Sequence, residues 1–195
     1  MIYLFLFLMS TTFYENIDVC GVQSEFKSYM DYNAITNTKS LQGQLKATVS
    51  EIDENGIYTL NGRKLVAMGQ KSLGIGDYVD ITLDSGETLE VIIGDIKHEG
   101  CNSGDGSQIE FIVDTKNMNK EVKLMGNFNI IYKGVIKEMR KNLYKNFELY
   151  KEDITLIQSI KEIQKEYYSV QDLINWKMIE ENRVKIIEDF FEWKE

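Results

Sequence analysis

The stretch that decides the fold is residues 62–114, GRKLVAMGQKSLGIGDYVDITLDSGETLEVIIGDIKHEGCNSGDGSQIEFIVD. Within it, short apolar and β-branched runs at residues 64–68, 78–83, 88–93 and 108–113 are separated by glycine-rich turns. Alternation of apolar and polar residues over about 4 to 8 positions is typical of a half-buried strand. Because no helical spacing interrupts these runs, the stretch predicts a mainly β domain rather than an alternating α/β sheet.

The residues before this stretch extend the β pattern. Residues 26–36 (FKSYMDYNAIT) predict an entry strand, and residues 44–52 (QLKATVSEI) alternate apolar and polar side chains as a second strand does. Residues 57–60 (IYTL) predict a third strand between two Asn-Gly pairs, the strongest short hairpin signal. Short strands at this close spacing predict a small, closed, six-stranded barrel, whose closure would protect apolar strands from edge pairing.

After residue 114 the pattern changes. Residues 116–126 predict a short helix or turn, and residues 129–135 (NIIYKGV) predict a last strand. From residue 136 onward the spacing is helical, and every third residue over 154–163 is isoleucine. The sequence therefore predicts an amphipathic helical extension at residues 136–195. This extension either docks on the barrel or self-associates, or it serves as a partner-binding arm.

The chain begins with an unbroken apolar run, MIYLFLFLM (residues 1–9), and a polar segment to residue 24 that predicts a linker. The run is long enough for the apolar region of a signal peptide but short of the roughly 20 residues that span a bilayer. Three interpretations stay open: a shortened membrane anchor, an atypical export signal, or a buried strand. We favour an export or anchor remnant at residues 1–24, ahead of a barrel domain at residues 25–135. That interpretation predicts a cell-envelope or extracellular location.

The composition narrows the functional classes. A formal net charge of −9 and a pI near 4.8, with no stripe of basic residues, argue against nucleic acid as a partner. A hydrophobic content of 43% is enough to bury a core. The sequence has no nucleotide-binding glycine motif, nucleophile elbow or HExxH motif, so we expect no cofactor and no metal.

Two cysteines, Cys20 and Cys101, are too few for a disulfide scaffold or for a structural zinc site, which needs four ligands. For an exported chain, a single bridge between them and two free thiols both stay open. Two free thiols are the expectation for a cytosolic one.

The candidate site lies around the loop that follows residues 88–93. Asp95 comes directly after Gly94, and Glu110 stands in the next strand between two apolar residues. Strand alternation turns Glu110 away from those neighbours, either into solvent or into a shielded groove suited to general acid work. Two carboxylates flanking a glycosidic bond are the minimal requirement for sugar cleavage. The structural alternative is that Asp95 caps a turn and Glu110 is a solvated strand position.

Two basic residues in the same loop are candidate substrate ligands. Lys97 and His98, the only histidine, follow Asp95 closely and would suit an anionic or polar sugar.

Taken in order, VAMG (66–69), GDYVDITL (76–83), EVIIGDIKHEG (90–100) and GSQIEFIVDT (106–115) resemble the 3D domain. This double-psi β-barrel family is named for three aspartates and occurs in bacterial cell-wall lytic transglycosylases and in stationary-phase or spore-associated wall proteins. The resemblance covers about residues 26–135 and is nearest to forms from Firmicutes and their phages. It implies a double-psi β-barrel fold and peptidoglycan as the partner.

The family's functional aspartates map unevenly onto this chain. Asp95 matches the aspartate of one family signature, Glu110 stands where the family has its catalytic aspartate, and Gly69 stands where it has another. The resemblance implies a non-hydrolytic mechanism. One carboxylate protonates the glycosidic oxygen and then helps the muramyl hydroxyl attack its own anomeric carbon, while the other stabilises the developing positive charge.

These observations leave competing functions. The first is a lytic transglycosylase-like enzyme that acts on peptidoglycan glycan strands and is exported or carried on a phage particle. The second is a catalytically inactive barrel that binds the cell wall or serves as a structural module of a virion or mobile element. In the second case the C-terminal helices would form the assembly surface. A third, a cytosolic regulatory barrel, requires residues 1–9 to be a buried strand.

Overall fold

The computed structural model describes residues 14–49, 51–97 and 100–147, together with Thr155, Ser159, Glu162 and Ile174. The chain divides into two compact units, Met1–Tyr150 and Lys151–Glu195. The four described positions of the second unit are helical, as predicted for that part of the extension. The apolar run at residues 1–9 lies outside the described residues.

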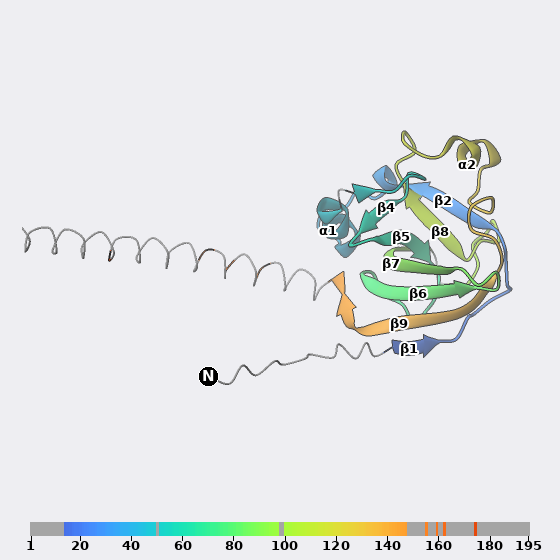
Figure 1. Ribbon diagram of the computed structural model, residues 1–195, viewed down its shortest axis with the longest axis horizontal. Coiled ribbons are helices and arrows are strands. Elements are labelled where there is room, and N and C mark those ends of the chain that lie inside the picture. The colour runs from blue at the N-terminus through green and yellow to red at the C-terminus, as the bar shows by residue number, and fades with distance from the viewer. Residues whose placement is uncertain are drawn as a thin grey trace, which may run out of the picture. The chain divides into compact units, whose positions relative to one another are not determined.

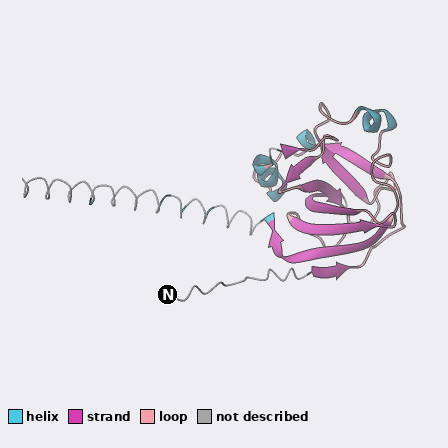
Figure 2. Ribbon diagram, in the orientation of Figure 1, coloured by secondary structure: helices cyan, strands magenta, loops and turns pink. Residues whose placement is uncertain are grey.

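The described part of the first unit is built mainly from strands (Figure 1). Figure 2 shows that helices are short additions to it. In chain order the elements are β1 (Tyr14–Ile17), β2 (Lys27–Asp31), η1 (Tyr32–Ala34), α1 (Leu41–Thr48), β3 (Glu51–Ile52), β4 (Tyr58–Leu60), β5 (Arg63–Met68), β6 (Asp77–Leu83), β7 (Thr88–Ile96), β8 (Ile109–Val113), α2 (Lys120–Met125) and β9 (Ile136–Asn146). No described helix is long and apolar enough to cross a membrane.

The nine strands form one mixed sheet. Its main order is β1-β9-β6-β7-β5-β4-β3, and β8 pairs with both β5 and β2. Two pairings, β5 with β7 and β2 with β8, are parallel. The mainly β prediction is confirmed, but the predicted closure is not found, because no pairing among the described strands joins β1 to β3.

The predicted linker and helix contribute two of these strands, which is why the sheet is larger than expected. β1 lies inside the segment predicted as a linker and pairs antiparallel with β9. β9 in turn pairs with β6, and its register shifts between Thr82 and Leu83, so that Ile136 and Glu138 are opposite successive residues. This bulge leaves Ile136 and Met139 both buried, a spacing of three that resembles a helix in the sequence. The helix predicted for residues 136–146 is therefore wrong.

Two further local predictions are wrong. Residues 44–52, predicted as one strand, supply most of α1 up to Thr48, and only Glu51 and Ile52 form a strand, β3. The Ser40 side chain caps this helix by accepting a hydrogen bond from Gly43 N, and Leu45 is fully buried. Residues 129–135, predicted as a strand, form turns in which Tyr132 N donates to Phe128 O at 2.9 Å. Both runs are too short for alternation alone to separate a strand from a buried turn or helix.

The hairpin turn between β4 and β5 follows from the sequence. Asn61 and Gly62 have φ values of 53° and 75°, so both central residues adopt the left-handed region. Such turns match the twist of the strands they join, and asparagine with glycine tolerates this backbone best.

The central strands bury side chains on both faces. One face carries the larger apolar cluster, which includes Val66 and Phe111. The opposite face, called the α1 face below, carries Leu65 together with Leu45 of α1 and seven other buried residues (Tyr32, Val49, Leu60, Tyr78, Ile92, Ile112 and Phe147). α1 therefore covers the apolar part of this face, and the polar residues discussed next lie beside it.

Candidate functional site

The register of three strands brings the two predicted carboxylates to one face. Ala67 on β5 pairs with Asp95 on β7 and, on its other side, with Glu110 on β8. Residues paired across neighbouring strands point to the same face, so Asp95 and Glu110 flank Ala67 on the α1 face. Since neighbouring strands lie about 4.8 Å apart, the Cα atoms of the two carboxylates are separated by roughly 9.5 Å.

A β-bulge gives Asp95 this orientation. Val66 pairs with Ile93, but the next residue, Ala67, pairs with Asp95, so Gly94 is the extra residue. Without the bulge, alternation would put Asp95 on the same face as Ile93, inside the larger apolar cluster. Gly94 also permits close packing, because a Cβ built on it would lie 2.6 Å from Ile112 Cδ1.

Asp95 faces α1 and a small pocket. Its Oδ1 accepts hydrogen bonds from Gln42 Nε2 at 3.3 Å and from Ile96 N at 2.8 Å. No described residue donates a hydrogen bond to its Oδ2, which leaves that oxygen available to a ligand. The pocket has a volume of about 250 Å³ and is lined by Ala34, Ile35, Thr36, Asn37, Ser40, Gln42 and Asp95.

Glu110 belongs to a second polar group, centred on Lys97. The ammonium of Lys97 lies 3.5 Å from Glu110 Oε1 and 3.5 Å from Asp105 Oδ1. It also donates to Ser28 Oγ at 2.7 Å and to Ser107 Oγ. The Lys97 side chain is only 10% exposed. Its charge is thus satisfied by the protein, which favours a role in holding these oxygens over the predicted role of binding substrate directly.

Asp105 is the most strongly perturbed carboxylate of this group. Burial by itself raises the pKa of Asp105, but two hydrogen bonds from Ser107 and the nearby Lys97 ammonium outweigh burial and lower the pKa to about 2. The hydrogen bonds come from Ser107 N at 2.9 Å and Ser107 Oγ at 2.7 Å. Asp105 is therefore ionised at neutral pH and stabilises the ammonium beside it.

The side chain of Lys97 reaches across β5 toward β8. Lys97 N donates to Met68 O at 3.2 Å, so the backbone is next to β5, whereas Nζ reaches Glu110 on β8. The methyl group of Ala67, between them, is fully buried. Asp95 and Glu110 thus share a face but have different partners, an amide for Asp95 and an ammonium for Glu110.

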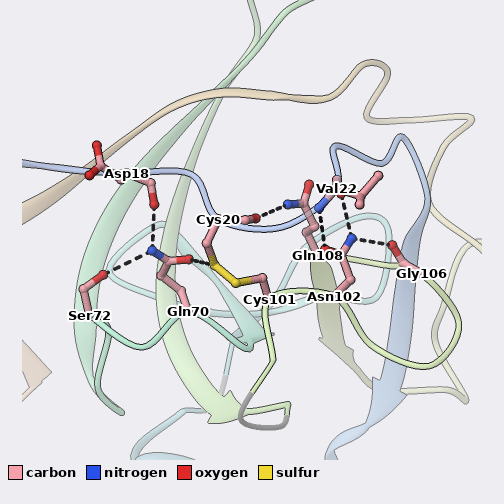
Figure 3. The surroundings of a disulfide bond; sticks show 9 residues. All are labelled: Asp18, Cys20, Val22, Gln70, Ser72, Cys101, Asn102, Gly106 and Gln108. Atoms are coloured by element: carbon pink, nitrogen blue, oxygen red, sulfur yellow. Dashed lines mark hydrogen bonds between the residues drawn. A yellow bond between two sulfur atoms is a disulfide. The ribbon is translucent and has the colours of Figure 1, made fainter.

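The loop that holds Asp105 is fastened by a disulfide between Cys20 and Cys101 (Figure 3). The bridge that the sequence left open is formed, and it joins residues 81 positions apart. Asn102 adds a pair of bonds, accepting from Val22 N at 3.0 Å and donating to Val22 O at 2.7 Å. Gln108 Nε2 donates to Cys20 O at 2.8 Å. Residues 18–24, called the strap below, thus lie along the loop at residues 100–108.

Sequence reasoning found part of this arrangement. Asp95 and Glu110 share a face, Lys97 lies beside Glu110, and His98 lies outside the described residues. Gln42, Ser28 and Ser107 were missed as site residues because only the register and α1 bring them near the carboxylates.

A scan against protein-family models matches none, and a search of curated protein sequences finds no match. Among the described residues there is no group of three or more His, Cys, Asp or Glu side chains placed to hold a metal ion.

Proposed function

We propose that this chain is a cell-wall protein that cleaves peptidoglycan glycan strands as a lytic transglycosylase does. The observation that carries the proposal is the register that sets Asp95 and Glu110 on either side of Ala67. Carboxyl groups roughly 5 to 9.5 Å apart flank the scissile bond in glycoside-cleaving enzymes. Side chains that rise from Cα atoms two strands apart reach that range.

The partners of the two carboxylates favour different roles. A general acid must carry a proton, and Asp95, which accepts from a neutral amide and borders a pocket, suits that role. Glu110 Oε1 lies 3.5 Å from the Lys97 ammonium and accepts a hydrogen bond from Ser28 Oγ at 3.4 Å, an environment that favours a carboxylate. Glu110 therefore suits stabilisation of the positive charge that develops on the sugar.

The proposed reaction needs no group from outside the chain and the substrate. The Asp95 carboxyl gives its proton to the glycosidic oxygen, and the bond from that oxygen to the anomeric carbon breaks. Asp95, now a carboxylate, accepts the proton of the muramyl C6 hydroxyl, whose oxygen bonds to the anomeric carbon. The products are an anhydromuramyl end and a new free end on the leaving sugar, and Asp95 has regained its proton.

The proposal also includes the type of β fold. We infer that β2, β5, β6, β7 and β8 are five strands of a six-stranded double-psi β-barrel, and the two parallel pairings β2–β8 and β5–β7 support this. β1 and β9 would then be additions at one edge. A cell-envelope or extracellular location is supported by the Cys20–Cys101 disulfide, which is compatible with an oxidising compartment.

The second candidate is a catalytically inactive wall-binding or virion module. It is favoured by the ion pair between Lys97 and Glu110, which already occupies that carboxylate, and by Gly69, which stands where the resembled family has an aspartate. In this case the protein binds glycan without cutting it, and the helices predicted from the sequence after residue 147 would provide an assembly surface.

Digestion of purified peptidoglycan by the full-length protein separates the two candidates. Mass spectrometry of the soluble products should find anhydromuramyl ends, absent with Asp95→Asn and with Glu110→Gln. Glu90→Gln is the matched control, because it removes an exposed carboxylate from the same strand as Asp95. Wall that binds the folded protein without release of product would favour the inactive module.

An aryl glycoside with a nitrophenolate leaving group tests the two roles. Nitrophenolate departs without protonation, so Asp95→Asn should lose much less activity on this substrate than on peptidoglycan, and the loss that remains reflects the missing base for the C6 hydroxyl. Glu110→Gln should lose activity on both substrates, because the charge on the sugar develops in either case. The reverse pattern would exchange the two assignments.

A further inference from the structure

We propose that α2 and the residues next to it form a docking surface for an anionic lipid membrane. In this arrangement two apolar side chains enter the boundary between headgroups and acyl chains, and nearby lysines lie against lipid phosphates. The surface, called the α2 tip below, consists of Lys116, Lys120, Lys123, Leu124 and Met125. The inference does not depend on cleavage of glycan.

The helix α2 is a rigid support for this surface, because a buried side chain and both of its caps fix it. Val122 is fully buried and belongs to the larger apolar cluster. Asn119 accepts a hydrogen bond from Glu121 N at 2.9 Å, and its own N donates to Asn55 O at 3.1 Å. Gly126, with a φ of 72°, ends the helix, and its N donates to Val122 O at 2.8 Å. A rigid surface lowers the ordering cost of binding.

Two apolar side chains at the end of α2 are left uncovered. Leu124 is 86% exposed and Met125 is 57% exposed. Two positions further along a helix a side chain is turned by roughly 200°, so Leu124 points away from the buried Val122. Every other exposed large apolar side chain among the described residues stands alone in the chain. Single exposed apolar residues are common on protein surfaces, whereas a contiguous apolar pair indicates an interaction site.

Lysines around this pair reverse the charge of the chain locally. Residues 115–127 contain three lysines (116, 120 and 123) against one glutamate (121), a net charge of +2 in a chain whose total is −9. The three lysines are exposed, and none of them forms an ion pair with a described residue. Lys120 precedes Leu124 by four residues, so the two side chains share one face of α2.

This combination favours a lipid surface over a soluble anionic partner. Binding in the membrane interface strengthens with the apolar area that enters it and with attraction between basic residues and anionic lipids. A soluble polyanion would contact the lysines and leave the apolar pair in water. The cell-envelope location proposed above would supply such a membrane. Figure 1 shows α2 apart from α1, so docking at the α2 tip would leave the surface around α1 uncovered.

The test is flotation of the full-length protein with vesicles made of equal parts of phosphatidylcholine and phosphatidylglycerol. Leu124→Ser together with Met125→Ser should lower the partition coefficient about tenfold or more, because the apolar area that enters the interface is lost. Lys120→Gln should lower it about fivefold. Val22→Ser and Lys71→Gln change exposed side chains elsewhere, so these matched controls should partition as the wild type does.

A fluorophore reads docking at α2 itself, independently of any other segment that binds lipid. Nitrobenzoxadiazole attached to Leu124→Cys should shift its emission to shorter wavelength on the anionic vesicles, because the dye enters an apolar environment. The same dye on Val22→Cys should not shift, since that exposed side chain belongs to the strap.

Four results would overturn the inference. The first is an unshifted emission of the dye at position 124, and the second is equal partition of the wild type and the Leu124 and Met125 double variant. The third is equal binding to vesicles of phosphatidylcholine alone. The fourth is binding of soluble poly(glycerol phosphate) that is lost with Lys120→Gln and kept with the double variant, which would assign the lysines to an anionic polymer instead.

Discussion

The two halves of the candidate site are held in place by different means. Asp95 and Ala67 are fixed by backbone pairing between β7 and β5, with a bulge at Gly94 to set the direction of the side chain. Asp105 and Lys97 are held by side-chain contacts within a loop that a disulfide fastens to the strap. The comparison teaches that the half fixed by backbone pairing should tolerate loss of the strap, whereas the half formed by Asp105 and Lys97 should not.

The largest effect is expected from removing the disulfide. Cys20→Ser together with Cys101→Ser should lower the free energy of unfolding by about 2 to 5 kcal/mol, because the bond closes a long loop of the unfolded chain. Denaturant unfolding measures this loss. Hydrogen exchange should then quicken at residues 100–108 while the amides of β5 and β7 stay protected. Equal loss of protection in both regions would contradict the comparison.

The next largest effect is expected from a substitution in the half that is fixed by backbone pairing. Gly94→Ala should lower the free energy of unfolding by about 1 to 3 kcal/mol, since the added Cβ would lie 2.6 Å from Ile112 Cδ1 in a buried position. Gly104→Ala is the control in the loop, where a Cβ meets nothing within 4 Å. Its thermal unfolding should match that of the wild type. Similar losses in the two variants would show that the bulge is not tightly packed.

The smallest effect is the acid dependence of the loop. The folded pKa of Asp105 is lowered to about 2 from an ordinary value of 3.8. A depressed carboxyl pKa adds stability above the unfolded value, and this stability is lost as the pH falls from about 4 to about 2. Asp105→Asn should therefore make the fall in Tm over that range shallower. Glu87→Gln, which removes an exposed carboxylate elsewhere, should leave the slope of Tm against pH unchanged. The same slope in the wild type and both variants would contradict the lowered pKa of Asp105.

The sequence predicted the strands whose apolar runs are bounded by glycine turns, and it singled out Asp95 and Glu110. It could not show that Asp95 turns away from the larger apolar cluster, because simple alternation from Ile93 puts it inside. The bulge that changes this depends on which strand lies alongside. The same limit explains β9, where a bulge opposite Leu83 gives buried residues a helical spacing.

Contacts between distant segments were also beyond sequence reasoning. Ser28 reaches Lys97 because β2 pairs in parallel with β8, a pairing that no local pattern encodes. The helix α1 was predicted as a strand, so Gln42 could not be placed beside Asp95. The disulfide was one of two alternatives in the sequence, and it forms because the strap lies along the loop at residues 100–108.

The most direct test of the central claim is the rate of anhydromuramyl release from purified peptidoglycan by four full-length proteins: wild type, Asp95→Asn, Glu110→Gln and Glu90→Gln. Our account predicts release by the wild type and the Glu90 variant, with losses of about 100-fold or more for the Asp95 and Glu110 variants. Release at the wild-type rate by both carboxylate variants would contradict the claim that the register of β5, β7 and β8 builds the cleavage site.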